Sequence, residues 1–462
     1  MTMPPAFDVA LPVTPGTHRA KKESQHVWHP FTQMQEYQAL PTLSIVSGKG
    51  GWLTDSEGNE YLDGNASIWT NVHGHNDPEL NQALIHQLNQ VAHSTLLGVT
   101  HPKAVELAAV LSRLAPASLD KVFFTDNGSG AVEVALKLSF QYWQLKGKSE
   151  KQHVIGLSNG YHGDTFGTMA VGDSGFFHDR FRPWCFKTSH IASPTCQELN
   201  GKIKSSNSAE SLKALEDLLK LKHLETACVI IEPSVQGAAG MQLLPPGYTA
   251  AVLALCKTYG VHLICDEVFV GFGRLGSMII SKEENVIPDF ICLAKGLTAG
   301  YLPLAATLVK SDIYDAFLGT YDSRKAFFHG HTFTGNPLGC AVALENIRKL
   351  EVLIDSGKLQ SRIKAFGVAL EAAFKSHPKV LSVRQRGLCA AIDLDFEAKR
   401  NPLDTWPNIR LGLRVCLEAR SHGLLIRPLG NSLLLVPPLC LSEDELNLLI
   451  QKTLASINAI LP

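Results

Sequence analysis

Two neighbouring stretches decide the fold. Residues 261–276 read Val-His-Leu-Ile-Cys-Asp-Glu-Val-Phe-Val-Gly-Phe-Gly-Arg-Leu-Gly, and residues 289–296 read Asp-Phe-Ile-Cys-Leu-Ala-Lys-Gly. Each contains a short apolar run typical of a buried strand, and the two runs end at Asp266 and Lys295. Burying a carboxylate without a cationic partner costs free energy. Because ligands of α/β folds bind at the carboxyl ends of the strands, we expect Asp266 and Lys295 to face one crevice.

Four further apolar runs resemble this pair. They are bounded by Gly, Pro or Asp, and segments with helical periodicity separate them, as in a sheet covered on both faces. The sequence therefore predicts an α/β fold with a large, mostly parallel sheet. The four runs are Lys121–Thr125, Val154–Leu157, Ala227–Ile231 and Leu304–Val309.

The helix expected after residue 128 can be counted directly. Glu133 lies four residues before Lys137 on its polar side, a spacing that favours a helix. Its apolar face contains Ala131, Val134, Ala135, Leu138 and Tyr142.

The two ends of the chain have a different pattern. Residues 44–63 alternate short apolar stretches with turn residues, which predicts small antiparallel strands. After about residue 340, a long amphipathic helix, the run Leu381–Asp395, another helix and the strand Leu433–Val436 predict a smaller α+β domain.

We therefore divide the chain into three parts. Residues 1–75 form an N-terminal arm and a segment that contributes to the small domain. Residues 76–340 form the large domain, which carries Asp266 and Lys295. Residues 341–462 form the C-terminal small domain.

The composition excludes several classes of protein. The 462 residues include 42 Lys+Arg and 43 Asp+Glu, and 45% are hydrophobic but only 18% charged. This balance excludes a disordered chain and a polybasic nucleic-acid binder. No apolar run approaches the ~18 residues of a membrane span, so we expect no membrane insertion. The low charge also favours a large subunit interface.

The cysteines and the N-terminus indicate the compartment. The ten cysteines contain no C-x-x-C pair, and several lie in apolar runs, as expected of buried free thiols in a reducing cytoplasm. Residues 1–22 contain four prolines and no apolar stretch of a secretion signal. We predict a cytoplasmic protein.

Two tempting motifs do not carry the function. Gly271-Phe-Gly-Arg-Leu-Gly276 matches the dinucleotide pattern, but only about a dozen residues separate it from Pro288, too few for the long helix that a pyrophosphate requires. The pairs His73-Gly-His75 and His329-Gly-His331 have no carboxylate or thiol companion, so we predict no metal site.

A phosphate turn is a stronger candidate. Asp126-Asn-Gly-Ser-Gly130 follows a predicted strand and opens the helix counted above. Its small residues would let backbone N–H groups and the Ser129 hydroxyl surround a phosphate. A simple capped turn is the alternative.

One cofactor uses all of these groups together. Pyridoxal phosphate needs an amine for its aldehyde, an anion beside its ring nitrogen, a phosphate cup and a flat stacking partner. These four groups are supplied by Lys295, by Asp266, by the turn at Gly128 and Ser129, and by Tyr161, which follows another strand. The lysine would also carry the proton of the reaction.

Longer segments resemble the class III (omega-type) aminotransferases of fold type I, from Trp28 to about Pro438. The resemblance implies a large mostly parallel-sheet domain, a smaller α+β domain and bound pyridoxal 5'-phosphate. Besides residues 264–276 and 293–303, it rests on 27–34 (Val-Trp-His-Pro-Phe-Thr-Gln-Met), 159–165 (Asn-Gly-Tyr-His-Gly-Asp-Thr), 231–237 (Ile-Glu-Pro-Ser-Val-Gln-Gly), 328–337 (Phe-His-Gly-His-Thr-Phe-Thr-Gly-Asn-Pro) and 426–430 (Ile-Arg-Pro-Leu-Gly).

The resemblance assigns the cofactor site. Lys295 matches the lysine that bonds to the cofactor, and Asp266 matches the partner of the ring nitrogen. Gly128 and Ser129 match the phosphate turn, and Tyr161 matches the residue stacked over the ring. Lys295, Asp266 and Tyr161 are therefore the predicted catalytic residues.

The resemblance also implies a homodimer with a shared active site. Thr332 matches a phosphate ligand that comes from the other subunit, and Gly330 of the same segment is a predicted substrate contact. Arg427 matches an arginine that binds a substrate carboxylate, for which its two-donor fork is suited. Arg274 would pair with a carboxylate or brace its turn, and Glu232 would orient ring substituents or form a buried ion pair.

Within the family, the segments are most similar to members that convert 8-amino-7-oxononanoate to 7,8-diaminononanoate in biotin synthesis. S-adenosylmethionine is the predicted amino donor. Members with this donor have Trp at the position of Trp69 but Tyr at that of Phe31 and Trp at that of Ile68. A branch that resembles residues 71–75 and 93–97 uses L-lysine, so L-lysine, or another ω-amino acid or diamine substrate, remains the alternative.

Overall fold

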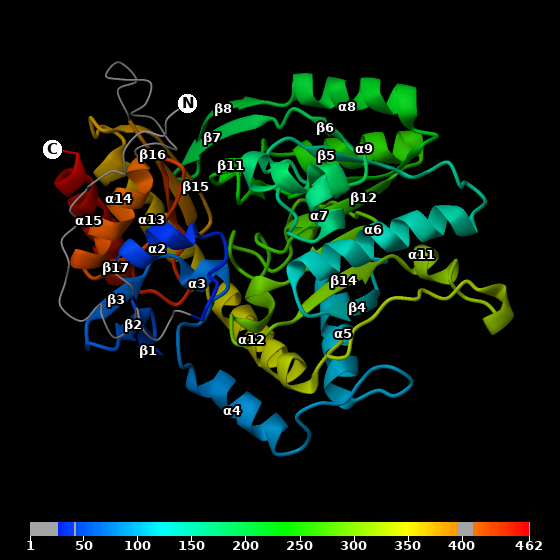
Figure 1. Cartoon of the computed structure of the whole chain (residues 1–462), viewed down its shortest axis with the longest axis horizontal. Coiled ribbons are helices and arrows are strands. Elements are labelled where there is room, and N and C mark those ends of the chain that lie inside the picture. The colour runs from blue at the N-terminus through cyan, green and yellow to red at the C-terminus, as the bar shows by residue number, and fades with distance from the viewer. Residues whose placement is uncertain (1–25, 41–42, 396–409, 462) are drawn as a thin grey trace.

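A computed structural model describes residues 26–40, 43–395 and 410–461, and a seven-stranded sheet forms its centre (Figure 1). All six predicted strand runs belong to this sheet. In sheet order, its strands are β4 (Lys121–Thr125), β14 (Ala305–Val309), β13 (Phe290–Leu293), β12 (His262–Asp266), β9 (Thr226–Ile231), β5 (His153–Leu157) and β6 (Ser189–Ile191).

The sheet is mostly parallel, as predicted. β13, β12, β9, β5 and β6 pair in parallel, whereas β14 runs antiparallel to both β13 and β4. β6 was not predicted, because Ser189-His-Ile191 is short and has one apolar side chain that is buried.

Alternation along the strands builds two cores. In β12, Ile264 packs into a cluster with α6 (Gly128–Leu145), while its neighbours Leu263 and Cys265 pack into the larger cluster on the other face. Ala131, Val134, Ala135 and Leu138 of α6 are buried, as predicted. The larger cluster draws on α5 (Pro102–Leu114), α9 (Tyr248–Tyr259) and α12 (Pro337–Asp355).

The predicted N-terminal strands form a separate antiparallel sheet. It consists of β1 (Ile45–Lys49), β2 (Trp52–Asp55) and β3 (Glu60–Asp63). Its fourth strand, β17 (Leu424–Leu425), comes from the far end of the chain and pairs in parallel with β3. The N-terminal segment therefore contacts the C-terminal region, and the division at residues 75 and 340 stays a prediction.

Two further sheets lie within the described residues. β15 (Val380–Arg386), β16 (Cys389–Leu394), β19 (Ser432–Leu435) and β18 (Arg427–Leu429) form the C-terminal sheet in that order. The second sheet was not predicted, since its strands are short or polar. It consists of β10 (Val235–Gln236), β11 (Gln242–Leu243), β7 (Thr195–Leu199) and β8 (Lys202–Asn207).

The single long helix expected after residue 340 is two helices. α12 ends at Asp355 and α13 (Lys358–Phe374) begins after Gly357, whose φ of 72° is left-handed and favours glycine. The other helices are α2 (Met34–Ala39), α3 (Ala66–Trp69), α4 (Pro78–Leu88), α7 (Phe166–Val171), α8 (Ala209–Lys222), α10 (Ile280–Glu283), α11 (Ser311–Asp315), α14 (Leu411–Ser421) and α15 (Glu443–Ile460), with short 3₁₀ turns at Gly175–Phe177, Asp179–Trp184, Lys295–Thr298 and Tyr321–Ser323.

Three sequence expectations can be compared with the fold. All ten cysteines are free thiols, and eight of them are buried. The glycines at 271–276 form turns that lead to the four-residue α10, not to a long helix. Among the helices of the described ranges, we find none with the length and apolarity that crossing a bilayer requires.

Candidate active site

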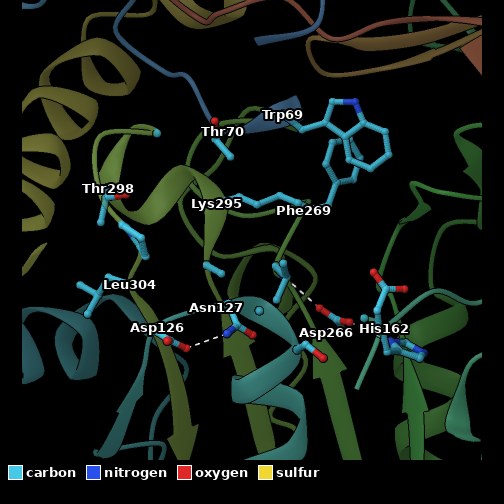
Figure 2. A pocket seen from close by; sticks show the side chains of 18 of the residues that line it. Trp69, Thr70, Asp126, Asn127, His162, Asp266, Phe269, Lys295, Thr298 and Leu304 are labelled. Carbon is cyan, nitrogen blue, oxygen red and sulfur yellow. Dashed lines mark hydrogen bonds and ion pairs between the residues drawn. The ribbon is translucent and has the colours of Figure 1, made fainter. Parts of the chain in front are cut away.

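A cavity of about 660 Å³ lies where the strands of the large sheet end (Figure 2). Asp266 ends β12, Lys295 follows β13, and the turn at Asp126–Asn127 follows β4. All of them line the cavity, which confirms that Asp266 and Lys295 face one crevice. The predicted residues among its lining are Trp69, Gly128, Ser129, Tyr161, Asp266 and Lys295.

Lys295 lies at the centre of the cavity wall. Its φ of 45° is in the left-handed region, which costs a non-glycine residue free energy. Its Nζ lies 5.0 Å from the ring centroid of Trp69 and 5.6 Å from that of Phe269. Burial lowers the pKa of Lys295, while the charges of Asp266 and Glu232 oppose this shift. A lysine in this setting loses its proton more readily and becomes a better nucleophile.

Asp266 has a buried partner that the sequence did not indicate. Nδ1 of His162 lies 2.7 Å from Oδ2 of Asp266, and Oδ1 accepts a hydrogen bond from the N–H of Val268 at 3.0 Å. Burial by itself lowers the pKa of His162, but the hydrogen bond and charge of Asp266 outweigh it and raise that pKa. The carboxylate is therefore held in one orientation toward the cavity.

The predicted phosphate turn opens α6. The side chain of Asn127 caps the helix by accepting the N–H of Gly130 at 2.8 Å. Ser129 Oγ lies 2.8 Å from Oγ1 of Thr165 and 3.0 Å from Oγ1 of Thr168. The turn thus presents free helical N–H groups and a hydroxyl at one side of the cavity.

Glu232 and Tyr161 lie together beside this turn. Glu232 accepts the N–H of Tyr161 at 3.1 Å and that of Gly237 at 3.0 Å. Burial raises the pKa of Glu232 to about 7. The Tyr161 hydroxyl donates to Asp164 at 2.9 Å, and burial raises its pKa. Beyond the two roles considered for Glu232 from the sequence, the structure shows that it lines the cavity and braces the backbone there.

Five predicted site residues lie outside the lining of this cavity. Phe31 and Ile68 are 57% and 46% exposed, and Phe31 contacts Phe177 on the surface. The other three, Gly330, Thr332 and Arg427, are exposed. Within the single chain these residues do not join the lining around Lys295. Ile68 lies in α3, Arg427 lies on the short strand β18, and the other three lie outside helices and strands.

Arg274 braces the fold and does not reach the cavity lining. It is buried, and its guanidinium donates to the carbonyls of Leu388 at 3.0 Å and Pro437 at 2.6 Å. Burial lowers its pKa to about 10. Of the two roles left open by the sequence, its contacts support bracing the turn.

Sequence reasoning missed His162 and Phe269. His162 follows Tyr161 within the quoted segment 159–165. The cost of burying Asp266 was recognised, but only Lys295 and the cofactor ring were considered as its partners. The position of His162 shortly after β5, beside the predicted Tyr161, is the signal that could have found it.

The residues present fit pyridoxal 5'-phosphate. Lys295 offers an amine, Asp266 an oriented carboxylate, and Ser129 a hydroxyl beside a helix N-terminus. The cradle also requires glycine, since a Cβ on Gly128 would lie 2.6 Å from Val268 and one on Gly163 2.4 Å from Ser129 Oγ. The cavity volume is within the usual range for small-molecule sites.

A cavity of this composition at the strand ends of a mostly parallel sheet defines a fold type I pyridoxal-phosphate enzyme. The class III aminotransferase family model matches residues 32–457. This chain belongs to the class III aminotransferases, as predicted, and is a pyridoxal-phosphate-dependent transaminase.

Individual relatives agree with this assignment. The chain is 46% identical over 441 residues to adenosylmethionine-8-amino-7-oxononanoate aminotransferase of Geobacter sulfurreducens, covering 95% of this chain and 97% of the relative. The crystal structure of the enzyme of that name from Methanocaldococcus jannaschii has a TM-score of 0.88 at 38% identity, covering 96% of this chain and 99% of that one. An amine transaminase from an uncultivated Pseudomonas species, in its PLP-bound form, has a TM-score of 0.83 at 33% identity, covering 94% and 99%.

Proposed function

We propose that this protein transfers an amino group from S-adenosylmethionine to the keto carbon of 8-amino-7-oxononanoate, giving 7,8-diaminononanoate. The observation that carries the proposal is the near full-length similarity to relatives that bear the name of this reaction. The cavity supports it, because its amine and carboxylate are those that amino transfer requires.

Lys295 carries the proton in both halves of the reaction. When bound, pyridoxal 5'-phosphate supplies the aldehyde carbon that accepts an amino group and the ring that accepts electrons. The lowered pKa of Lys295 keeps a larger fraction of its amine neutral, so Nζ can take a proton from the donor and return it to the acceptor. The flanking Trp69 and Phe269 rings limit water beside Nζ.

The neighbouring groups orient the ring and the phosphate. Asp266, held by His162, would present its carboxylate to the ring nitrogen, and Tyr161, which lines the same cavity, would stack against the ring. Ser129 and the N–H groups at the start of α6 would hold the phosphate. The two substrates then use one cavity in turn, which predicts ping-pong kinetics.

We also propose a homodimer with a shared active site. Residues 324–333, here called the strap, lie between α11 and α12 at the edge of the molecule (Figure 1). The strap is held by Gln141 of α6, which donates to the carbonyls of Lys325 at 3.2 Å and Ala326 at 3.1 Å. Thr332 and Gly330 are exposed and do not line the cavity of their own chain, which supports a role for them in the cavity of a second copy.

Mass photometry tests this assembly. We expect a species of about twice the 50.3 kDa chain mass. Mixing a Lys295→Ala subunit with a Thr332→Ala subunit should restore part of the activity, because one site of the hybrid then has both intact residues. A monomer that is fully active would contradict the proposal.

The predicted residues outside the cavity lining are here called the rim, and we assign Phe31, Ile68 and Arg427 among them to substrate binding. Arg427 binds the carboxylate of 8-amino-7-oxononanoate, for which a bidentate guanidinium is suited. Trp69 lines the cavity, and Phe31 and Ile68 lie beyond it near the surface. Since Phe31 lacks a hydroxyl and Ile68 lacks a ring, these two positions bear on the choice of donor.

Comparing donors tests the function. Purified holoenzyme with 8-amino-7-oxononanoate receives either S-adenosylmethionine or L-lysine, and diaminononanoate is measured by mass spectrometry. Product with S-adenosylmethionine supports the proposal, and product with L-lysine alone supports the alternative donor. No product with either donor, but transfer to another ω-amino acid or diamine pair, would overturn the assigned reaction.

We place the enzyme in the cytoplasm, because its cysteines are free thiols, as is typical of proteins in a reducing compartment.

A further inference from the structure

Glu133 on α6 caps a helix to which it does not belong. The short helix α7 begins after Thr165, whose own side chain makes no cap hydrogen bond. Instead, Oε1 of Glu133 accepts the N–H of Gly167 at 2.8 Å and that of Thr168 at 3.3 Å. These are the N–H groups that an N-cap side chain ordinarily satisfies. A carboxylate there also complements the positive end of the helix.

The same oxygen fixes the proton of Thr165. Oγ1 of Thr165 donates to Oε1 of Glu133 at 2.5 Å. The Thr168 hydroxyl joins the same cluster, since its Oγ1 can donate to the carbonyl of Thr165 at 2.9 Å. Thr165 therefore cannot also donate its hydroxyl proton to Ser129, whose Oγ accepts the N–H of Thr165 at 3.2 Å.

Within this cluster, the Ser129 hydroxyl is thus the one whose proton is available for a hydrogen bond to a ligand. Its Oγ lies 2.8 Å from Thr165 Oγ1 and 3.0 Å from Thr168 Oγ1 and must be the donor to one of them. A phosphate oxygen is a stronger acceptor than a threonine hydroxyl, so the Ser129 proton would turn to it.

Close packing shows that the cluster is built to a fixed geometry. A Cβ on Gly167 would lie 2.3 Å from Oε2 of Glu133, and one on Gly163 would lie 2.4 Å from Ser129 Oγ. Both glycines let the 163–168 segment approach α6 closely enough for these bonds.

We propose that Glu133 is a positioning residue for the phosphate group of the cofactor. It fixes the start of α7 and the side chain of Thr165, and thereby holds Ser129 Oγ, which contacts Thr165 and Thr168, in position to donate to the phosphate. The inference rests on the cofactor of the family and is independent of which donor and acceptor the enzyme uses.

The test compares the binding of a ligand that has the phosphate group with the binding of one that lacks it. Apoprotein of wild type, Glu133→Ala and Glu133→Gln is titrated with pyridoxal 5'-phosphate and with pyridoxal, which lacks the phosphate, and binding is followed by absorbance. For Glu133→Ala we expect about tenfold weaker binding of pyridoxal 5'-phosphate, the size expected from losing one or two hydrogen bonds, and less than about threefold change for pyridoxal. For Glu133→Gln we expect less than about a threefold change, because the amide oxygen still accepts.

Gln144→Ala on the same helix is the matched control, since its amide bonds to the Ser149 carbonyl at 3.5 Å, away from the cluster. Thermal unfolding of each apoprotein checks the fold, and Glu133→Asp replaces the alanine variant if that does not fold, with the same expected selectivity. Equal losses for both ligands, no loss for either, or a glutamine variant as weak as the alanine one would overturn the proposal. Since no substrate is present, a wrong substrate assignment would leave this result unchanged.

Discussion

The wall of the cavity and its rim differ in how they are built. Lys295, Asp266 and Ser129 lie at strand ends or helix starts, and hydrogen bonds to the buried residues His162 and Thr168 hold the latter two. Thr332 and Arg427 lie on exposed segments outside the cavity lining. The wall is therefore formed within one chain, whereas we propose that the rim is completed by a partner subunit or a substrate. The chemistry should depend on the wall and the specificity on the rim.

Replacing the central amine should have the largest effect. Lys295→Ala is expected to lower kcat by about 10⁴-fold or more, because it removes both the covalent attachment and the proton carrier. Added pyridoxal 5'-phosphate should no longer give the visible absorbance of the lysine-bound form. Circular dichroism should show an unchanged fold. An unchanged spectrum in this variant would show that the cofactor is not attached at Lys295.

The second-largest effect is expected from neutralising Asp266, the predicted partner of the ring nitrogen. Asp266→Asn is expected to lower kcat by roughly 10²–10⁴-fold, since the ring nitrogen loses the charge that keeps it protonated. Glu267→Gln is the matched control, because the Glu267 carboxylate turns away and accepts from Ser281 N at 2.8 Å and Ser281 Oγ at 2.6 Å. Equal kcat losses in both variants would remove the distinction between the wall and its surroundings.

A change at the rim should affect binding and not chemistry. Arg427→Ala is expected to raise the KM for 8-amino-7-oxononanoate by roughly 10–100-fold, because a charge-assisted hydrogen bond to the substrate is lost. The kcat should change much less. Arg414→Ala, an exposed arginine on α14, serves as the control. Steady-state kinetics measure both. A lower affinity for pyridoxal 5'-phosphate in the Arg427 variant would place that residue in the wall.

The smallest effect concerns stability and pH. Burial raises the pKa of Glu267 from 4.5 to about 7. The folded state then binds more protons than the unfolded state between these values, so this residue's contribution to stability falls as pH rises through that window. Glu267→Gln should reduce this fall by at most about 3 kcal/mol. Urea unfolding of the apoprotein at pH 5, 6, 7 and 8 measures it, and parallel curves for wild type and variant would contradict it.

The sequence predicted the strands that are apolar and bounded by turn residues. All six runs entered the large sheet, because burial on both faces requires continuous apolar sequence. β6 and the β7–β8 pair were missed, since their partly exposed strands carry no such signal. The break between α12 and α13 depends on one left-handed glycine, Gly357, within an otherwise helical pattern.

The sequence by itself determined the chemistry, because an amine, a carboxylate and a glycine-rich turn at strand ends meet at one edge of a parallel sheet in any right-handed α/β fold. Only the tertiary structure decided how these groups are supported. The pairing of His162 with Asp266 and the capping of α7 by Glu133 join residues 104 and 34 positions apart in the chain. Such contacts depend on the packing of whole helices and strands, which no local pattern specifies.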